Sequence, residues 1–285
     1  MTKQSHESDG GITRLLRHAR NDVLLVSAFL VMIGAFVTGG VRAAVLPDDR
    51  ADALYHSYEG GGVEITGPSL LVLKKFGQNV AVTGNYYVDS VSSASIDVVT
   101  SGASEYAEER TEFSGGVDYL HGNSVMSLSY TNSSENDYDA NSASFGISMD
   151  MFGNMTTLSL GYAHGWDTVG QNGTPTFSED IRRDSYRLGI SQVITKDMVL
   201  EINYEGITDE GFLNNPYRVV NYDDGAGGRA QQPEVYPRTR TSSALTLRTK
   251  YYLPWRAAAM GEYRFFADTW GIDAHTLKFG YTHPL

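Results

Sequence analysis

The feature that most constrains this chain is a two-residue alternation of large apolar side chains with small or polar ones. It is clearest in MDMFGNMTTLSLGYAHGW (149–166), where the part after the Gly-Asn pair has its large residues at even positions. Successive side chains of a β-strand point to opposite faces, so the pattern predicts a strand with one apolar and one polar face. The residues before the pair alternate in the same way. Phe-Gly-Asn-Met between them predicts the tight turn of a hairpin, because Gly and Asn tolerate positive φ.

The same alternation recurs along the chain and predicts twelve strands, although two early segments, 51–58 and 62–75, alternate poorly. The predicted connections alternate in length. Short turns are expected at 77–79, 122–123, 153–154, 196–197 and 254–255. Most of the connections between them are longer and polar, at 90–105, 167–178 and 211–234, with shorter ones near 59–61, 132–137 and 270–272. Outer-membrane barrels have short periplasmic turns and longer extracellular loops, whereas a soluble sandwich has no reason to segregate loop lengths. We therefore expect an all-β fold, a closed antiparallel up-and-down transmembrane β-barrel of about twelve strands.

Aromatic residues provide a second indication of a membrane barrel. In the expected topology, one set lies toward the outer strand ends: Tyr130, Tyr162, Trp166, Tyr186, Tyr204 and Tyr263. A second set lies toward the periplasmic ends: Tyr119, Phe152, Tyr251, Trp255 and Tyr281. Two aromatic girdles around an apolar band are typical of transmembrane barrels. Simple aromatic enrichment in strands is the alternative, and it would scatter these residues along the strands.

Residues 1–43 are expected to be a signal peptide, and 44–285 the barrel domain. An uncharged apolar run at 23–41 follows three arginines, and Val41-Arg42-Ala43 places small residues at the positions that signal peptidase reads. An uncleaved membrane anchor is the alternative, because 19 apolar residues are just long enough to span a bilayer.

Charge and cysteine usage exclude several classes of function. The chain carries a formal net charge of -12, which argues against nucleic acid as a partner. It contains no cysteine, so disulfides and cysteine-ligated metals or haem are excluded. No cofactor is expected.

Several long phrases resemble a family of Gram-negative outer-membrane proteins catalogued as domain of unknown function 3570. They are DSVSSASIDVV, YAEERTEFSGGVDYLHG, TNSSENDYDANSASFGIS, ITDEGFLNNPYRVV, YPRTRTSSAL and EYRFFADTWGIDAHTLKFGYTHP. The resemblance runs from about residue 50 to the C-terminus. It implies an outer-membrane β-barrel and assigns no catalytic or binding residues. Genes of this family often neighbour those for a thioredoxin-like protein and a small lipoprotein, so the resemblance names both as candidate partners.

The C-terminal strand is similar to the signal that the barrel-assembly machinery reads. Phe279, Tyr281 and Leu285 alternate on its outward face, with Leu285 in place of the more usual Phe. We therefore expect the assembly machinery, outer-membrane lipids and lipopolysaccharide as partners.

Eight charged residues are expected on the inward face of neighbouring strands: Arg187, Glu201, Glu205, Arg248, Lys250, Glu262, Arg264 and Lys278. Paired charges that pack the interior of a barrel are one interpretation. A charged constriction that selects a solute is the other, with the basic members forming an anion-attracting wall. A passive channel for small solutes is thus the leading functional hypothesis.

The outer loops carry the alternative hypothesis, a scaffold that binds partner proteins of an export or redox-linked system. Loop candidates are Asp209, Glu210, Phe212, Tyr217 and Arg218, in a segment that combines an apolar-aromatic centre with acids. Long extracellular loops carry function more often than strands do. Glu135, Asp137 and Asp139 could ligate calcium, but they lack a full EF-hand set, so a solvated acidic loop is expected.

An outer-membrane hydrolase is the third class of function, and we expect that the chain is not an enzyme. His164 and Ser159 fall on opposite faces of one strand. His275 and Ser243 are expected two strands apart and at different heights. No nucleophile, base and orienting group converge in the sequence as a catalytic triad requires.

Overall fold

The structure is a computed structural model that describes residues 44–284 except 61–62, 94–105, 224 and 226–227. The expected signal peptide and Leu285 lie outside the described residues. Within the described ranges, no helix is long and apolar enough to cross a membrane.

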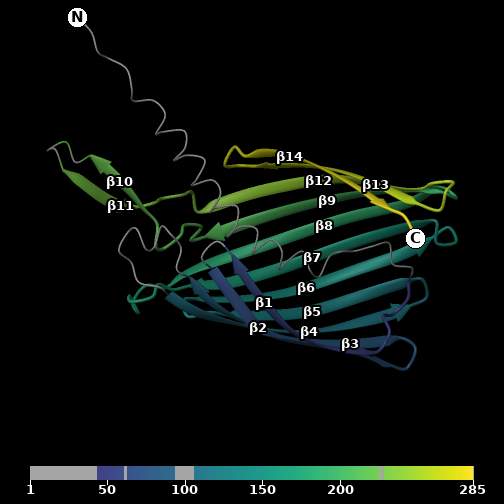
Figure 1. The fold of residues 1–285 in the computed structure, drawn as a ribbon, viewed down its shortest axis with the longest axis horizontal. Coiled ribbons are helices and arrows are strands. Elements are labelled where there is room, and N and C mark those ends of the chain that lie inside the picture. The colour runs from purple at the N-terminus through teal and green to yellow at the C-terminus, as the bar shows by residue number, and fades with distance from the viewer. Residues whose placement is uncertain (1–43, 61–62, 94–105, 224, 226–227, 285) are drawn as a thin grey trace, which may run out of the picture. The chain divides into compact units, whose positions relative to one another are not determined.

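The described residues form an antiparallel sheet of twelve strands that follow one another in chain order (Figure 1). The strands are β1 (Arg50–Gly60), β2 (Val63–Phe76), β3 (Val80–Ser93), β4 (Tyr106–His121), β5 (Ser124–Ser134), β6 (Tyr138–Met151), β7 (Thr156–Val169), β8 (Glu179–Thr195), β9 (Met198–Gly211), β12 (Thr239–Tyr252), β13 (Ala258–Asp268) and β14 (Asp273–Thr282). The expected strand number and up-and-down order are confirmed for this part of the chain. A separate hairpin of β10 (Val219–Asp223) and β11 (Arg229–Pro233) lies between β9 and β12, in a segment that the sequence predicted as plain loop.

The connections divide the sheet into a short-turn end and a long-loop end. At the short-turn end, the β6–β7 turn has Phe152, Gly153 and Asn154 at φ values of 53°, 66° and 66°. This is the turn predicted from Phe-Gly-Asn-Met, and it places even a phenylalanine in the left-handed region. At the long-loop end lie the connections that follow β1, β3, β5, β7, β9 and β13.

The two faces of the sheet have the polarity predicted by the alternation. On one face, here called the apolar face, large side chains are exposed, for example Phe145 at 50%, Leu160 at 48% and Leu188 at 48%. On the other, the polar face, carboxylates and hydroxyls such as Asp150, Thr157 and Glu201 are buried. No second layer of regular structure in the described residues covers the polar face (Figure 1). The described sheet thus has one apolar and one polar face.

The small apolar core lies at the short-turn end of the polar face. Leu46, which precedes β1, packs with Leu73 of β2, Ala81 of β3 and Leu120 of β4. The segment 44–49 thus runs along the inner side of the sheet. Among the described residues no register joins β14 to β1, so these two strands are the edges of the sheet.

Gly67 allows an unusually close approach of β2 to β3. A Cβ atom built on Gly67 would lie 1.7 Å from the carbonyl oxygen of Val88, which is a backbone atom and cannot rotate away. The neighbouring ladder runs from Thr66↔Ser90 to Ser69↔Tyr87, and the register omits the two residues between them on β2. Only glycine fits at this position without a backbone shift.

We expect Gly67→Ala to destabilise the folded protein by about 2 kcal/mol or more, since overpacking against an immobile group forces the strands apart. Gly84→Ala is the matched control, because a Cβ at Gly84 of β3 meets no atom within 4 Å. The measurement is the urea midpoint of folding for both variants. Equal midpoints would contradict the close approach.

Candidate functional site: the charge network of the polar face

The eight predicted inward charges lie on the polar face and form two neighbouring rows of ion pairs, together called the charge network. Register explains the grouping: Glu201 of β9 stands opposite Arg248 of β12, and Arg248 stands opposite Glu262 of β13. Glu262 in turn stands opposite Lys278 of β14. The result is a row of alternating charge across four neighbouring strands.

Arg248 is the centre of this row. Its Nη1 lies 3.0 Å from Glu201 Oε2, and its Nε donates to Glu262 Oε2 at 2.7 Å. Lys278 Nζ lies 3.1 Å from the other Glu262 oxygen. Lys250 Nζ lies 3.8 Å from Glu201 Oε1. One guanidinium thus bridges two buried carboxylates, each of which also faces a lysine.

A second row lies closer to the long-loop end. Arg187 Nε of β8 donates to Glu205 Oε1 of β9 at 3.0 Å. Arg264 Nη2 of β13 approaches the other Glu205 oxygen at 3.9 Å. Glu205 is therefore shared by two guanidinium groups.

The glutamates and the lysines of the charge network differ in how deeply their side chains are buried. The side chains of Glu201 and Glu262 are only 6% exposed, whereas those of Lys250 and Lys278 are 50% and 62% exposed. The network holds five cations and three carboxylates. A solute that approaches the polar face here therefore meets ammonium groups first, with the carboxylates beneath them.

A second polar cluster, whose contacts sequence reasoning missed, lies on the polar face toward the other edge of the sheet, on β1, β3 and β4. His56 Nε2 of β1 lies 2.8 Å from Asp89 Oδ1 of β3, and the other Asp89 oxygen lies 2.6 Å from Arg110 Nη2 of β4. The His56 ring stacks on Tyr87 at 4.9 Å. Parity places Arg110 on the same face as Glu112, two residues away. The contact with Asp89 depends on the register of β3 against β4, which parity does not give.

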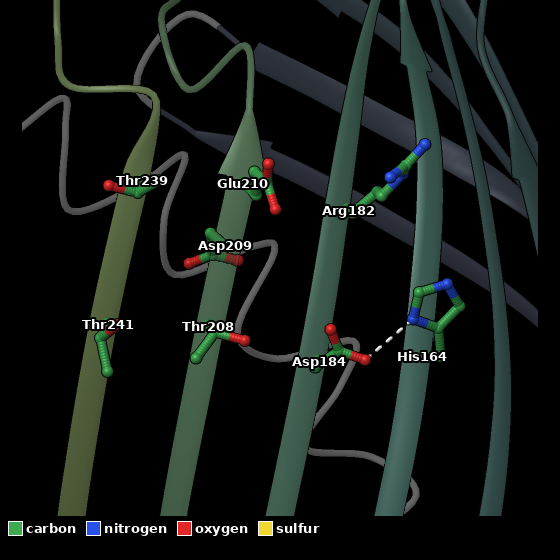
Figure 2. A pocket seen from close by; sticks show the side chains of 8 residues that line it. All are labelled: His164, Arg182, Asp184, Thr208, Asp209, Glu210, Thr239 and Thr241. Carbon is green, nitrogen blue, oxygen red and sulfur yellow. Dashed lines mark hydrogen bonds and ion pairs between the residues drawn. The ribbon is translucent and has the colours of Figure 1, made fainter.

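A polar groove of about 380 Å³ lies near the long-loop ends of β7, β8, β9 and β12 (Figure 2). Its lining is His164, Arg182, Asp184, Thr208, Asp209, Glu210, Thr239 and Thr241. His164 Nδ1 lies 2.9 Å from Asp184 Oδ1, the arrangement of a base with its orienting carboxylate. Figure 2 shows the threonines on the far side of Asp184 from His164, as the strand register requires. The groove thus holds two members of a triad without the third in reach, and the expectation that the chain is not an enzyme stays a prediction.

The other histidine expectation, for His275 and Ser243, concerns the apolar face. His275 stands opposite Phe265, while Ser243 stands opposite Ala267, so the two are separated by a strand and by two positions in height. His275 Nδ1 lies 2.7 Å from the hydroxyl of Tyr263. Packing beside an aromatic girdle accounts for this contact.

The predicted strand aromatics lie on the apolar face, but Tyr162 and Tyr186 of the outer set stand near the middle of β7 and β8 rather than toward their outer ends. Tyr162 and Tyr186 are cross-strand neighbours with ring centroids 5.3 Å apart. At the short-turn end, the indole N–H of Trp255 donates to the hydroxyl of Tyr281 at 3.0 Å. Tyr281 is 60% exposed and Phe279 83%, so the described part of the expected assembly signal faces outward on β14.

Two of the loop candidates are strand residues, which corrects the sequence prediction. Asp209 and Glu210 belong to β9, and Asp209 is buried on the polar face, where it accepts a hydrogen bond from Arg183 Nε at 2.5 Å. The physical reason is the arginine on β8, directly opposite in the register, which stabilises a carboxylate inside the sheet.

The remaining loop candidates tie the outer connections together. The hydroxyl of Tyr217 donates to Asp137 of the β5–β6 connection and accepts from the backbone N–H of Asn172 at 2.7 Å. Burial and the hydrogen bond to Asp137 raise the pKa of Tyr217. Phe212 packs edge-on against Phe177 at 5.3 Å. Arg218 Nη1 lies 3.9 Å from Glu234.

The acidic residues considered as calcium ligands, Glu135, Asp137 and Asp139, do not form a ligand set in the described structure. Asp137 is engaged by Tyr217, and Asp139 accepts from the Asn141 side chain at 2.6 Å. Burial raises the pKa of Glu135, and the positive charge of Arg110 offsets only part of this rise. Across the described ranges no three His, Cys, Asp or Glu side chains gather in a way that could hold a metal ion.

Solved structures with a similar strand arrangement include three bacterial proteins. The siderophore receptor PirA from Pseudomonas aeruginosa aligns at 9% identity and TM-score 0.47, over 84% of this chain and 43% of the receptor. The COG4313 outer membrane channel from Pseudomonas putida F1 aligns at 9% and 0.49, over 86% and 97%. A loop-deletion form of OmpT, an outer membrane protein of Vibrio cholerae, aligns at 10% and 0.40, over 81% and 88%. The chain thus spans less than half of the receptor's length.

Comparison with curated proteins gives no significant match. The model of one protein family, described as a protein of unknown function (DUF3570), matches residues 98–285. The match includes β4 to β14 and leaves out the first three strands, to which the sequence resemblance also extended. Since it covers more than half of the sequence, the chain belongs to the DUF3570 family.

Proposed function

We propose that the chain is exported, closes into a twelve-stranded β-barrel of the outer membrane, and acts as a passive channel for small anionic solutes. The observation that carries the membrane part is the inverted polarity of the sheet. One face of the sheet carries an exposed band of Leu, Ile, Phe and Tyr side chains, and the opposite face carries buried carboxylates and hydroxyls. Exposure of that apolar band to water is unfavourable, whereas its contact with lipid hydrocarbon is favourable. Hydrocarbon also does not tolerate the unpaired backbone groups of a strand edge.

Strand length fits the same setting. The sheet strands are 10 to 17 residues long, and a tilted strand of about 9–11 residues crosses the hydrocarbon core. β1 and β14 are the edges of the described sheet, and pairing them would satisfy their remaining backbone groups. In this arrangement the short-turn end faces the periplasm and the long-loop end faces outward.

The charge network supports the anion preference. Its lysines stand above the carboxylates that hold them, so the surface facing the lumen is basic on the side of β9, β12, β13 and β14. A twelve-stranded barrel is wider than the eight-stranded type, whose side chains fill the interior. A basic wall in a water-filled lumen raises the local concentration of anions.

A second candidate function is partner binding by the outer hairpin, β10 with β11. Figure 1 shows this hairpin beyond the ends of β9 and β12. Val219, Val220 and Tyr222 of β10 are 48%, 43% and 45% exposed, and β10 pairs only with β11 among the described strands. Exposed apolar strand edges are the surface that β-augmentation uses, so a protein partner such as a small lipoprotein would bind here.

The first prediction concerns the lipid-facing side. We expect Leu160→Arg, in the middle of β7 on the apolar face, to destabilise the barrel in lipid vesicles by about 2–4 kcal/mol, and Thr168→Arg, near the outer end of the same face, by about 0–1 kcal/mol. The measurement is the urea midpoint of folding into vesicles. Two equal and negligible effects would show that this face meets water.

The second prediction concerns selectivity. Lys250→Gln combined with Lys278→Gln should lower the anion-over-cation permeability ratio by a factor of about two to three, the effect of roughly 0.5 kcal/mol of Coulomb energy in an aqueous lumen. Planar-bilayer reversal potentials under a salt gradient give this ratio. Arg248 is unsuitable for the test, because its loss removes the guanidinium that bridges two buried carboxylates, at a cost of about 3–5 kcal/mol.

Lys196→Gln is the matched control, because this lysine is 90% exposed on the short β8–β9 turn and outside the network. An unchanged ratio in the double variant would contradict the basic wall. A folded barrel without conductance would overturn the channel proposal and favour the hairpin.

The third prediction separates the two functions. Replacing 219–233 with a Gly-Ser link should leave folding and conductance unchanged, because Val219 and Pro233 are already opposite one another at the hairpin base. Loss of conductance would mean that the hairpin belongs to the channel. Loss of a co-purifying lipoprotein, with conductance intact, would support the hairpin as the docking element.

A further inference from the structure

Asp150 is a buried carboxylate whose partners in the structure do not balance its charge. It lies at the short-turn end of β6, is 4% exposed, and accepts a hydrogen bond from Thr157 Oγ1 at 2.6 Å. Among the described residues no Lys, Arg or His side chain forms an ion pair with it. A buried carboxylate is costly unless it is paired, so this site calls for a cation.

The other partner of Asp150 is the backbone nitrogen of Ala44. That nitrogen donates to Asp150 Oδ2 at 2.6 Å, although the two residues are 106 positions apart in the sequence. Ala44 is the residue that follows Val41-Arg42-Ala43, the site at which the sequence predicts cleavage. Cleavage after Ala43 would hydrolyse the Ala43–Ala44 peptide bond, adding water, and would leave Ala44 with a free α-ammonium group.

We infer that Asp150 is the receptor for the new N-terminus: cleavage after Ala43 creates an ammonium group that forms a buried ion pair with Asp150. The site is built for this occupant. Thr157 binds one carboxylate oxygen and directs the other toward Ala44. The charge that Asp150 lacks is the one that cleavage supplies.

The segment that follows holds Ala44 in place. Leu46 is 4% exposed against Leu73 and Ala81, so it anchors the chain two residues after the nitrogen. At the far end, Asp48 lies 2.8 Å from Lys75 Nζ, and the Lys75 backbone N–H donates to Asp49 Oδ1 at 2.6 Å. Both ends of 44–49 are therefore held by contacts with the sheet.

The inference rests on the export and the barrel of the proposed function and is independent of conductance. Its test begins with the full-length gene expressed in a Gram-negative host. Intact mass and N-terminal sequencing of the protein from the outer-membrane fraction should give Ala44 as the first residue. A different first residue in a correctly located barrel overturns the inference alone. An uncleaved chain absent from that fraction overturns the proposed function as well.

A four-member cycle then tests the ion pair. One change is Asp150→Asn. The other inserts Gly-Gly between Ala43 and Ala44, which leaves the cleavage site in place but moves the ammonium group about 7 Å along the chain. The readout is the temperature at which the folded band converts to the unfolded band on a gel. Each single change should lower it by about 5 °C or more.

The combined variant decides the outcome. If the ammonium group binds Asp150, the insertion lowers the midpoint in the wild-type background and has no further effect beside Asp150→Asn. Additive losses would show that the two groups act separately and would overturn the inference. Asp118→Asn is the matched control, since Asp118 is a polar-face carboxylate near the same end that is bound by Ser127; the insertion should keep its full effect in that background.

Discussion

The alternation of side-chain direction along each strand is the constraint on which the rest of this structure depends. It places apolar side chains on one face and charges on the other. The antiparallel register then decides which charges meet. Glu201, Arg248, Glu262 and Lys278 are far apart in the sequence, yet each stands opposite the next because four strands share one register. A slip of one residue in any of these strands would turn its charge to the apolar face.

The sequence predicted what depends on local periodicity and missed what depends on long-range contacts. The facing of all eight network charges, the number of strands in the described sheet and the β6–β7 turn follow from a period of two and from the Gly-Asn pair. The partner of Glu201 could not be predicted, since the register of β9 against β12 is set across a long connection. The β10–β11 hairpin was missed because its apolar residues stand in a polar loop with no period long enough to read. Asp209 was misplaced because its arginine lies on another strand.

The charge network combines a structural and an electrostatic role in different atoms. Arg248 holds two carboxylates that are hidden from solvent, so its contribution is to the fold, where pairing is a condition of burial. The lysines reach past those carboxylates and are half-exposed or more. Under the proposed function, the two interpretations left open by the sequence, interior packing and a selective wall, would apply to different members of the same cluster.

The segment 44–49 also bears on the order in which the molecule is built. Ala44 contacts Asp150 of β6, which accepts a hydrogen bond from Thr157 of β7. Leu46 packs against side chains of β2, β3 and β4. None of these surfaces exists until strands far along the chain have paired. The first residues of the described chain thus find their place only after β2, β3, β4, β6 and β7 have formed, and their contacts are a local sign that these five strands are assembled.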